Sequence, residues 1–389
     1  MEGLLGIRES LSTLISRKFR EAYKNKDIIF SDTSLAIVQT QNGIPVGPNP
    51  FIPYNFLFQL RYCPALAKKP TSTPTSKPQG GSSDTHKMER EDSKTEKPKF
   101  NPFANPAPEL LIAQVPRGND NIKYSHALIL NKFPVIKNHF IIATKSNKPQ
   151  TAVLEEDDLS MTYACLRAWS NQRHDPAHSK RLFSFFNSGE HSGASQPHRH
   201  LQFLPVEDML RNEKEHFDLL IDHMTVQAHP DLPLYQDPAL PILHFATPLE
   251  EGNLSASALH SKYVMLLRAA ISAVQHPGEP FNSSSSFSVE DNSGSAAVSY
   301  NLAMTTERMA ICPRRKEGAG ILRGASASGP DSFVAINGTI LGGTLMVKDE
   351  AEWDLLRQDP SVLEDLLAEL GYPLLSWLSL EPTVTDARM

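Results

Sequence analysis

The chain has 389 residues, of which 40% are hydrophobic and 21% are charged, and its formal net charge is −6. These proportions are typical of a globular protein with an ample core, and the acidic balance argues against binding to a nucleic-acid backbone. No apolar run is long enough to cross a bilayer, so we expect no membrane insertion. The three cysteines, Cys63, Cys165 and Cys312, are far apart and form neither a metal-type spacing nor a disulfide framework. This usage favours a reducing compartment, and we expect a cytoplasmic protein that could also enter the nucleus.

The N-terminal region, residues 1–70, predicts one helix and two strands of a catalytic fold. Apolar residues recur at helical spacing from Leu11 to Phe19, which favours an amphipathic helix over a targeting peptide. Residues 28–41 and 55–63 are rich in β-branched and aromatic residues and predict strands.

The next segment, residues 71–100, is expected to be a disordered insertion. It consists mainly of Ser, Thr, Pro, Lys and Glu, and this composition cannot bury enough apolar surface to order the chain. Order should resume at 108–115, and Asn101-Pro102-Phe103 could dock as a short anchor before it.

Residues 101–248 are predicted to form the catalytic half. The pattern at 124–146 predicts a strand, a turn and a second strand, because Pro134 and Asn138 interrupt the apolar runs. Further elements are expected along this half: helices at 155–171 and 207–224, and a strand within 240–247.

Residues 249–389 are predicted to form a second half that is compact with the first. Its expected elements are a helix at 255–275, a low-complexity loop at 278–297, a hairpin at 300–318, a flexible stretch at 318–332, a strand pair at 333–347 and a helical C-terminus. Hairpins interleaved with separate helices predict an α+β fold and not a doubly wound parallel sheet. A weak echo of the 124–146 pattern at 300–347 suggests two related halves.

The stretch from Phe185 to Pro205, FFNSGEHSGASQPHRHLQFLP, combines a glycine-serine loop with a strand-like segment. His198, His200 and Gln202 alternate, so on a strand their side chains should share one face. The loop before them could bind phosphate through small residues, because glycine lets the main chain approach a ligand closely. The candidate phosphate contacts are the amides of Gly193, Ala194 and Ser195 and the side chains of Ser195 and Gln196.

This arrangement suits transfer of a nucleotidyl group. A neutral histidine can attack an α-phosphate and divide one displacement into two steps through a covalent nucleotidyl-histidine. A neutral amide such as Gln202 can hold a phosphoryl oxygen without protonating it, which favours transfer to an acceptor over hydrolysis. Two plainer interpretations of His198 and His200 remain open: one core and one exposed strand histidine, or a zinc site that lacks a clear third ligand.

His198-Arg199-His200-Leu201-Gln202 resembles the His-x-His-x-Gln signature of the transferase branch of the histidine-triad superfamily. Four blocks, PALAKKP, LNKFPVIKNHF, NSGEHSGASQPHRHLQ and YNLAMTTE…PRRK, are similar in order to diadenosine tetraphosphate phosphorylases, also called ATP adenylyltransferases. The resemblance implies a galactose-1-phosphate-uridylyltransferase-like α+β fold with antiparallel sheets, flanking helices and two pseudo-related halves. It also implies phosphorolysis of diadenosine tetraphosphate to ATP and ADP.

The resemblance assigns roles to individual residues. His200 would be the nucleophile that carries AMP, His198 would support it, and Gln202 would contact the phosphate. The residues that would contact substrate are Lys69, Asn131, Lys132, Asn187 and Gly193 to Gln196, with Thr305, Thr306, Glu307, Lys316, Asn337 and Gly343 for the second nucleotide. Arg199 stands where lysine is common in the family, and Arg308 stands where an aromatic is common.

Each of these residues also has a plainer interpretation. Lys69 and Lys132 could be solvated surface lysines, Asn131 could end its strand, and Asn187 could serve a turn. The basic run that ends at Lys316 could be a solvated face or could steer a polyphosphate substrate.

The expected partners are small molecules: a dinucleoside polyphosphate, ATP, ADP and inorganic phosphate. We expect neither a bound metal nor a tightly bound cofactor, although a divalent cation such as magnesium could accompany the polyphosphate. The chain should be a monomer or a homodimer. Two other functions stay open: a hexose-1-phosphate nucleotidyltransferase, whose branch carries proline where Arg199 stands, and a nucleotide-binding sensor without turnover.

Overall fold

The structure is a computed structural model, and it describes residues 4–40, 57–68, 101–116, 124–170, 180–210, 218–250, 254–279, 281, 288–321 and 333–374. The predicted insertion at 71–100 lies entirely outside the described residues. Lys69, residues 282–287 and residues 322–332 also lie outside them.

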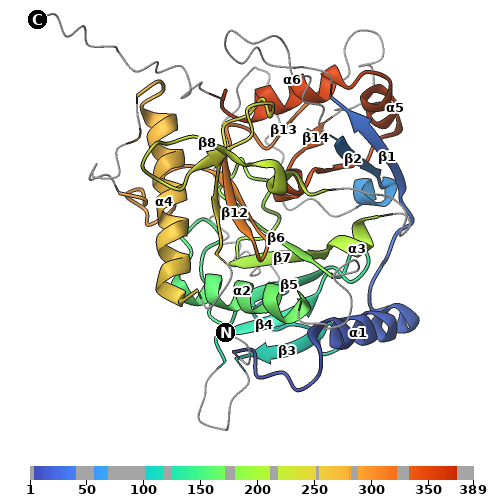
Figure 1. Ribbon diagram of the computed structural model, residues 1–389. Coiled ribbons are helices and arrows are strands. Elements are labelled where there is room, and N and C mark those ends of the chain that lie inside the picture. The colour runs from blue at the N-terminus through green and yellow to red at the C-terminus, as the bar shows by residue number, and fades with distance from the viewer. Residues whose placement is uncertain are drawn as a thin grey trace, which may run out of the picture.

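One large antiparallel sheet organises the molecule (Figure 1), and its strands follow the order β3-β4-β5-β7-β6-β11-β12-β10-β9-β8. Its strands are β3 (Leu111–Val115), β4 (His126–Leu130), β5 (Phe140–Thr144), β6 (Leu182–Ser188), β7 (His200–Pro205), β8 (Val226–Gln227), β9 (Tyr235–Gln236), β10 (Phe245–Pro248), β11 (Tyr300–Met304) and β12 (Arg308–Pro313). In the middle β6 pairs with β11, with Ser188 opposite Tyr300. Strands from both predicted halves therefore belong to one continuous sheet.

Two smaller sheets lie beside it. The first contains β1 (Ser34–Gln39), β2 (Leu57–Tyr62) and β15 (Thr344–Val347), and β2 pairs antiparallel with β1 and parallel with β15. The second pairs β13 (Gly318–Ala319) with β14 (Val334–Ala335).

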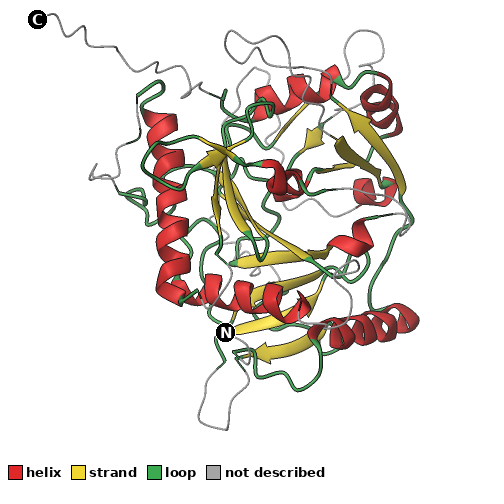
Figure 2. Cartoon of the chain, in the orientation of Figure 1, coloured by secondary structure: helices red, strands yellow, loops and turns green. Residues whose placement is uncertain are grey.

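The helices cover both faces of the large sheet (Figure 2), and the described residues form two cores. The helical elements are α1 (Leu11–Asn25), η1 (Pro64–Lys68), α2 (Glu156–Ser170), α3 (Val206–Met209), η3 (Leu220–His223), α4 (Ala256–Gln275), η5 (Gly338–Gly342), α5 (Glu350–Gln358) and α6 (Ser361–Leu370). The first core packs α1, α2 and α4 against the sheet, and the second packs η3, η5, α5, α6 and the three-stranded sheet. Along β11, Leu302 belongs to the first core and Ala303 to the second, so this strand is buried on both faces.

Local sequence signals explain several of these elements. In α1 the residues from Leu11 to Phe19 that recur at helical spacing are the buried ones, and Lys26 ends the helix with a left-handed backbone. The first turn of α2 carries three acidic residues, which suit the positive end of the helix dipole. Ser255 caps α4 by accepting a hydrogen bond from the Ala258 amide. The α+β class, the paired strands at 124–146 and the hairpin at 300–318 are thereby confirmed.

Two predicted elements were wrong. The expected helix at 207–224 begins as a single turn, α3, after which Leu210 is extended. In the remaining described part of this range, residues 218–224, only η3 is helical. The Met209 carbonyl at the end of α3 accepts a hydrogen bond from the Arg61 guanidinium at 2.6 Å. The predicted strand pair at 333–347 is also no pair, because β14 joins β13 and β15 joins β2, and the glycine-rich turn between them forms η5.

No helix among the described stretches is long and apolar enough to cross a membrane.

Candidate active site

The two histidines lie where the loop after β6 returns into β7. His200 is the first residue of β7, and His198 precedes it in an isolated bridge with Pro149. Both side chains are buried, with 3% and 0% of their surface exposed. Because Leu201 and Phe203 belong to the first core and Leu204 to the second, the alternation of β7 places His200 and Gln202 on the face opposite α2.

Hydrogen bonds determine which nitrogen of His200 carries the proton. Nδ1 lies 2.8 Å from the carbonyl oxygen of His198, and a carbonyl can only accept, so Nδ1 donates. Burial lowers the pKa of His200 to about 4, so the ring is neutral near pH 7. Its Nε2 therefore carries a lone pair, and no described residue hydrogen-bonds to it. A neutral imidazole with a free Nε2 is the form that a nucleophile requires.

Gln150, which the sequence did not indicate, aligns this strand with its neighbours. Its Oε1 accepts a hydrogen bond from the His200 amide at 2.8 Å. Its Nε2 donates to the carbonyl oxygens of Asn187 and His200 at 2.9 and 3.1 Å. A single side chain thus links the start of β7 to the end of β6 and limits movement of His200.

Gln202 ends a chain of hydrogen bonds that begins at Asn131. The Asn131 Oδ1 accepts from the Phe133 amide, so its Nδ2 faces the His139 ring, at 3.2 Å from Nδ1 and 3.4 Å from Nε2. The Nε2 of His139 then donates to the Gln202 Oε1 at 3.1 Å, which leaves the Gln202 amide N–H groups for another acceptor. The predicted residues Asn131 and Gln202 are therefore connected through His139. His139 stands in the block LNKFPVIKNHF, but only the pairing of β5 with β7 reveals its partner.

The glycine-serine loop packs against the C-terminal half. Gly193 has φ +77°, and a Cβ there would lie 2.8 Å from the Ile336 carbonyl oxygen and 2.9 Å from the Asn337 Cβ. The structure therefore brings the predicted loop, Gly193 to Gln196, next to Asn337, a residue predicted for the second nucleotide. Asn337 itself caps η5, since its Oδ1 accepts from the amide and hydroxyl of Thr339.

Asn187 belongs to a buried network beneath this loop. Its Oδ1 accepts from the Gly338 amide at 2.8 Å and from the Asn301 Nδ2 at 2.9 Å. Asn301 also donates to the Ser192 carbonyl and accepts from Arg314. These contacts connect the loop to η5 and β11, so the Asn187 oxygen has a structural role.

Other predicted contacts lie apart from the histidines. Thr305, Thr306 and Glu307 form the β11–β12 turn; Met304 pairs with Ser184, whereas the loop follows Ser188 at the other end of β6. Arg308, beside that turn, donates to the Met224 carbonyl.

The structure also describes two lysines and one glycine of the predicted set. Lys316 forms an ion pair with Glu369 of α6 at 2.8 Å, and Lys132 is exposed above the Phe133 ring. Gly343 ends η5 with φ +74°. Lys69 lies outside the described residues.

The opposite face of β7 carries an ion-pair cluster. Arg199 points away from the histidines, and its Nη1 lies 2.7 Å from Asp158 and 3.0 Å from Glu155. The Asp158 Oδ1 also lies 3.0 Å from the His126 Nε2. Burial alone would raise the pKa of Asp158, but the His126 hydrogen bond and the Arg199 charge outweigh it, so the pKa is below its usual value.

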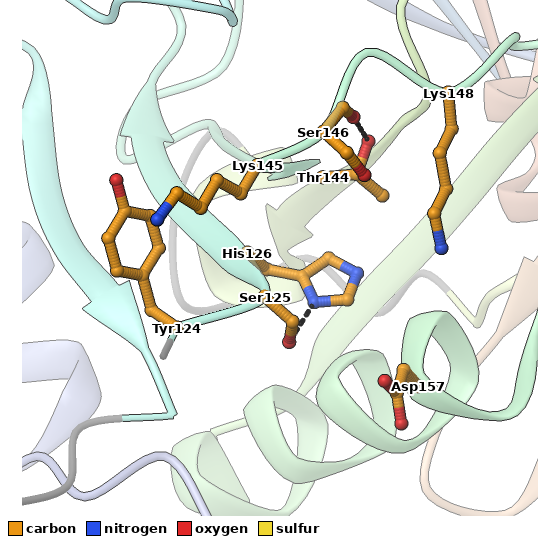
Figure 3. A pocket seen from close by; sticks show the side chains of 8 residues that line it. All are labelled: Tyr124, Ser125, His126, Thr144, Lys145, Ser146, Lys148 and Asp157. Atoms are coloured by element: carbon orange, nitrogen blue, oxygen red, sulfur yellow. Dashed lines mark hydrogen bonds between the residues drawn. The ribbon is translucent and has the colours of Figure 1, made fainter. Parts of the chain in front are cut away.

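A surface hollow of about 330 Å³ lies beside this cluster (Figure 3). Figure 3 shows His126 at its centre, with Lys145 over the Tyr124 ring on one side and Lys148 on the other. Thr144 lines the hollow and also contacts His198 through its backbone carbonyl, 2.7 Å from the His198 Nε2. Neither His198 nor His200 lines it.

Known proteins resemble this chain along most of its length. Residues 81–222 match the Ap4A phosphorylase N-terminal domain, and residues 238–373 match the ATP adenylyltransferase C-terminal domain. Diadenosine tetraphosphate phosphorylase 2 of Saccharomyces cerevisiae is 30% identical over 325 residues, which cover 81% of this chain and 84% of that protein. The S. cerevisiae protein APA1 is 28% identical over 378 residues, 95% of this chain and 96% of that protein.

Solved structures share the fold. The crystal structure of yeast Ap4A phosphorylase Apa2 in complex with Ap4A has a TM-score of 0.64 and 25% identity, and covers 95% of this chain and 99% of that chain. A further crystal structure of yeast Ap4A phosphorylase Apa2 has a TM-score of 0.65, 24% identity and the same coverage.

The fold, the paired histidines and these matches define a nucleotidyltransferase of the ATP adenylyltransferase type. The chain belongs to the diadenosine tetraphosphate phosphorylase family.

Proposed function

We propose that the protein catalyses the phosphorolysis of diadenosine tetraphosphate by inorganic phosphate, giving ATP and ADP through a covalent AMP on His200. The observation that carries this proposal is the hydrogen bond from His200 Nδ1 to the His198 carbonyl, which leaves the Nε2 lone pair free. The yeast relative named as a diadenosine tetraphosphate phosphorylase and the yeast Apa2 structure with Ap4A support the choice of substrate.

The reaction proceeds in two displacements. In the first, His200 Nε2 forms a bond to an α-phosphorus, and the bond from that phosphorus to the oxygen bridging to the β-phosphate breaks. ATP leaves with the electron pair, and AMP remains on the nitrogen. In the second, an oxygen of inorganic phosphate attacks the same phosphorus, the nitrogen–phosphorus bond breaks and ADP forms. The phosphate proton passes to solvent near pH 7, and the His200 Nδ1 proton stays in place throughout.

Gln202 would stabilise the α-phosphate oxygens. Its Oε1 is engaged by His139, so its amide N–H groups are the part that faces a ligand. A donor that is oriented before the reaction stabilises developing charge without reorganising at the transition state. A neutral amide donates hydrogen bonds but does not transfer its proton to the leaving group, which suits reversible transfer between phosphates.

The proposed function also has consequences for the accompanying cation and for the cellular compartment. A divalent cation such as magnesium would accompany the polyphosphate and neutralise part of its charge. The proposed compartment is the cytoplasm, together with the nucleus, and the free, buried state of Cys63, Cys165 and Cys312 supports a reducing environment.

The test is intact-protein mass spectrometry after brief incubation with diadenosine tetraphosphate in phosphate-free buffer. We expect an added AMP on the wild type, discharged as ADP when phosphate is supplied, and none on His200→Ala. His191→Ala is the matched control, because His191 lies in the same loop region and is partly exposed. Product without an adduct would contradict the covalent step, and discharge by a hexose phosphate instead of phosphate would favour a sugar nucleotidyltransferase.

A further inference from the structure

A short segment before β3 covers the paired histidines. It consists of residues 101–104, here named the histidine strap. The Asn101 Oδ1 accepts hydrogen bonds from the Phe103 amide at 3.0 Å and from the Ala104 amide at 3.2 Å, which closes a tight turn. Both donors are backbone N–H groups, which determines the orientation of the Asn101 side-chain amide. Its oxygen faces its own turn, and its nitrogen faces away from that turn.

The side-chain nitrogen of Asn101 contacts the buried ring of His198. Asn101 Nδ2 lies 2.9 Å from His198 Nδ1, and its other acceptor, Asn147 Oδ1, lies at 3.5 Å. An amide nitrogen only donates, so His198 Nδ1 accepts and carries no proton. The ring proton must then be on Nε2, which lies 2.7 Å from the Thr144 carbonyl oxygen and donates to it. Asn101 and Thr144 thus select one neutral tautomer of His198 from its two sides.

Phe103 completes the strap. Its ring centre lies 4.8 Å from that of His200 at an interplanar angle of 38°, and 5.9 Å from that of His198 at 88°. Phe103 is buried, with 8% of its surface exposed, so an apolar ring excludes water from one side of both imidazoles. Burial is also the main cause of the lowered pKa of both histidines.

We propose that Asn101 and Phe103 are positioning residues for adenylyl transfer: Asn101 determines the tautomer of His198, and Phe103 holds the His200 ring neutral and dry. The effect of Asn101 reaches His200 through the backbone, because the carbonyl that orients His200 Nδ1 belongs to His198. This proposal rests on the proposed function for its catalytic consequence, whereas the tautomer is a property of the unliganded protein. A small misplacement of a catalytic group can cost about 100-fold in rate, so a remote strap can matter.

Asn101→Asp tests the first part. The aspartate keeps the oxygen that closes the turn but replaces the donor toward His198 with a second acceptor. Nitrogen NMR of labelled histidine rings at pH 7 should show a proton only on Nε2 of His198 in the wild type. In the variant Nδ1 should carry a proton as well, because the new carboxylate accepts from Nδ1 while the Thr144 carbonyl still accepts from Nε2. The first-step rate at saturating substrate should fall about tenfold or more, with little change in half-saturation. The control is Asn105→Asp, at an exposed asparagine directly after the strap, and it should behave as the wild type.

A wild-type His198 protonated on Nδ1, or an Nδ1 that stays unprotonated in Asn101→Asp, would overturn the strap whatever reaction the enzyme catalyses. A changed protonation of His198 with an unchanged rate would overturn its catalytic role. If the wild type forms no AMP adduct, the proposed function fails, and the NMR result still decides the strap.

Phe103→Ala tests the second part, with Phe103→Leu as the variant that keeps an apolar cover. In Phe103→Ala water reaches the His200 ring, so the ring titration of His200 should move from about 4 toward its ordinary 6.5. The acid limit of the first step should move with it, and Phe103→Leu should keep both near the wild-type values. An unmoved titration in folded Phe103→Ala would contradict the role of the strap in burial.

Discussion

Arg199 and Asp158 form an ion pair of 2.7 Å on the face of β7 opposite to the histidines, and both side chains are almost fully buried. The residue between the two histidines therefore anchors the catalytic strand to α2. On one face of β7 the Arg199–Asp158 ion pair fixes the strand, and on the face that carries the histidines the strap contacts it through Phe103.

Arg199→Met should destabilise the protein by about 3–5 kcal/mol, because it leaves the Asp158 carboxylate buried without its main cation. Asp158→Asn should also destabilise it, since Arg199 would retain only Glu155. The double variant should lose less than the sum of the two, which urea unfolding measures as a coupling energy. Simple additivity would show that the pair does not act as a unit.

The first chemical step should tolerate acid well below the ordinary pKa of histidine. His200 has a pKa of about 4, lowered mainly by burial, so its nucleophilic form persists through pH 5. Quenched mass spectrometry of AMP-adduct formation should show a nearly constant rate from pH 7 to about 5 and a fall near pH 4. Circular dichroism at each pH is the control for folding, and a midpoint near 6.5 in the folded protein would contradict the burial argument.

His139→Ala should lower the turnover number about tenfold, because Gln202 loses the donor that orients its amide. His139→Gln keeps a side-chain amide between Asn131 and Gln202 and should recover part of the loss. Steady-state kinetics separate the effect: the turnover number should fall more than the Michaelis constant changes. Equal kinetics for the alanine and glutamine variants would contradict an orienting role.

Gly193→Ala should impair both stability and the first step. The position combines φ +77° with a Cβ that would meet the Ile336 carbonyl oxygen at 2.8 Å. Gly294→Ala is the matched control, because Gly294 has φ +79° but nothing lies within 4 Å of its Cβ position. The control should cost only about 1–2 kcal/mol of backbone strain, and Gly193→Ala should cost more and slow adduct formation. Equal melting temperatures would show that the loop does not depend on its contact with Asn337.

Stability should fall as the pH drops from about 6.5 to about 4. Burial lowers the pKa of both His200 and His244 to about 4, whereas the unfolded chain binds these protons near 6.5. The unfolded state binds more protons in this window, so each histidine contributes stability above it, of about 3 kcal/mol at most, that acid removes. Urea unfolding of His244→Gln at pH 7 and pH 5 should show a shallower pH dependence than the wild type. The control His191→Gln, at a partly exposed histidine, should leave the slope unchanged.

Elements with strong periodicity were predictable from the sequence. The amphipathic helix at Leu11–Asn25, the strand pair of 124–146 and the helix at 255–275 were predicted because each depends on apolar spacing within a short window. The predicted helix at 207–224 was wrong: α3 ends at Met209, whose carbonyl bonds to a distant side chain, Arg61. A pattern in one window carries no information about such a partner.

The sequence by itself determined which residues of the catalytic strand share a face and which loop can approach a phosphate, since strand alternation and glycine conformation are local properties. Only the tertiary structure decided which distant groups contact them. Asn101 forms a hydrogen bond with His198, His139 forms one with Gln202, and Asp158 forms an ion pair with Arg199. Strand pairing and core packing bring these residues together from segments far apart in the chain. The reactive form of His200 depends on both levels: its alternating position is local, whereas the burial that keeps it neutral is a property of the packed fold.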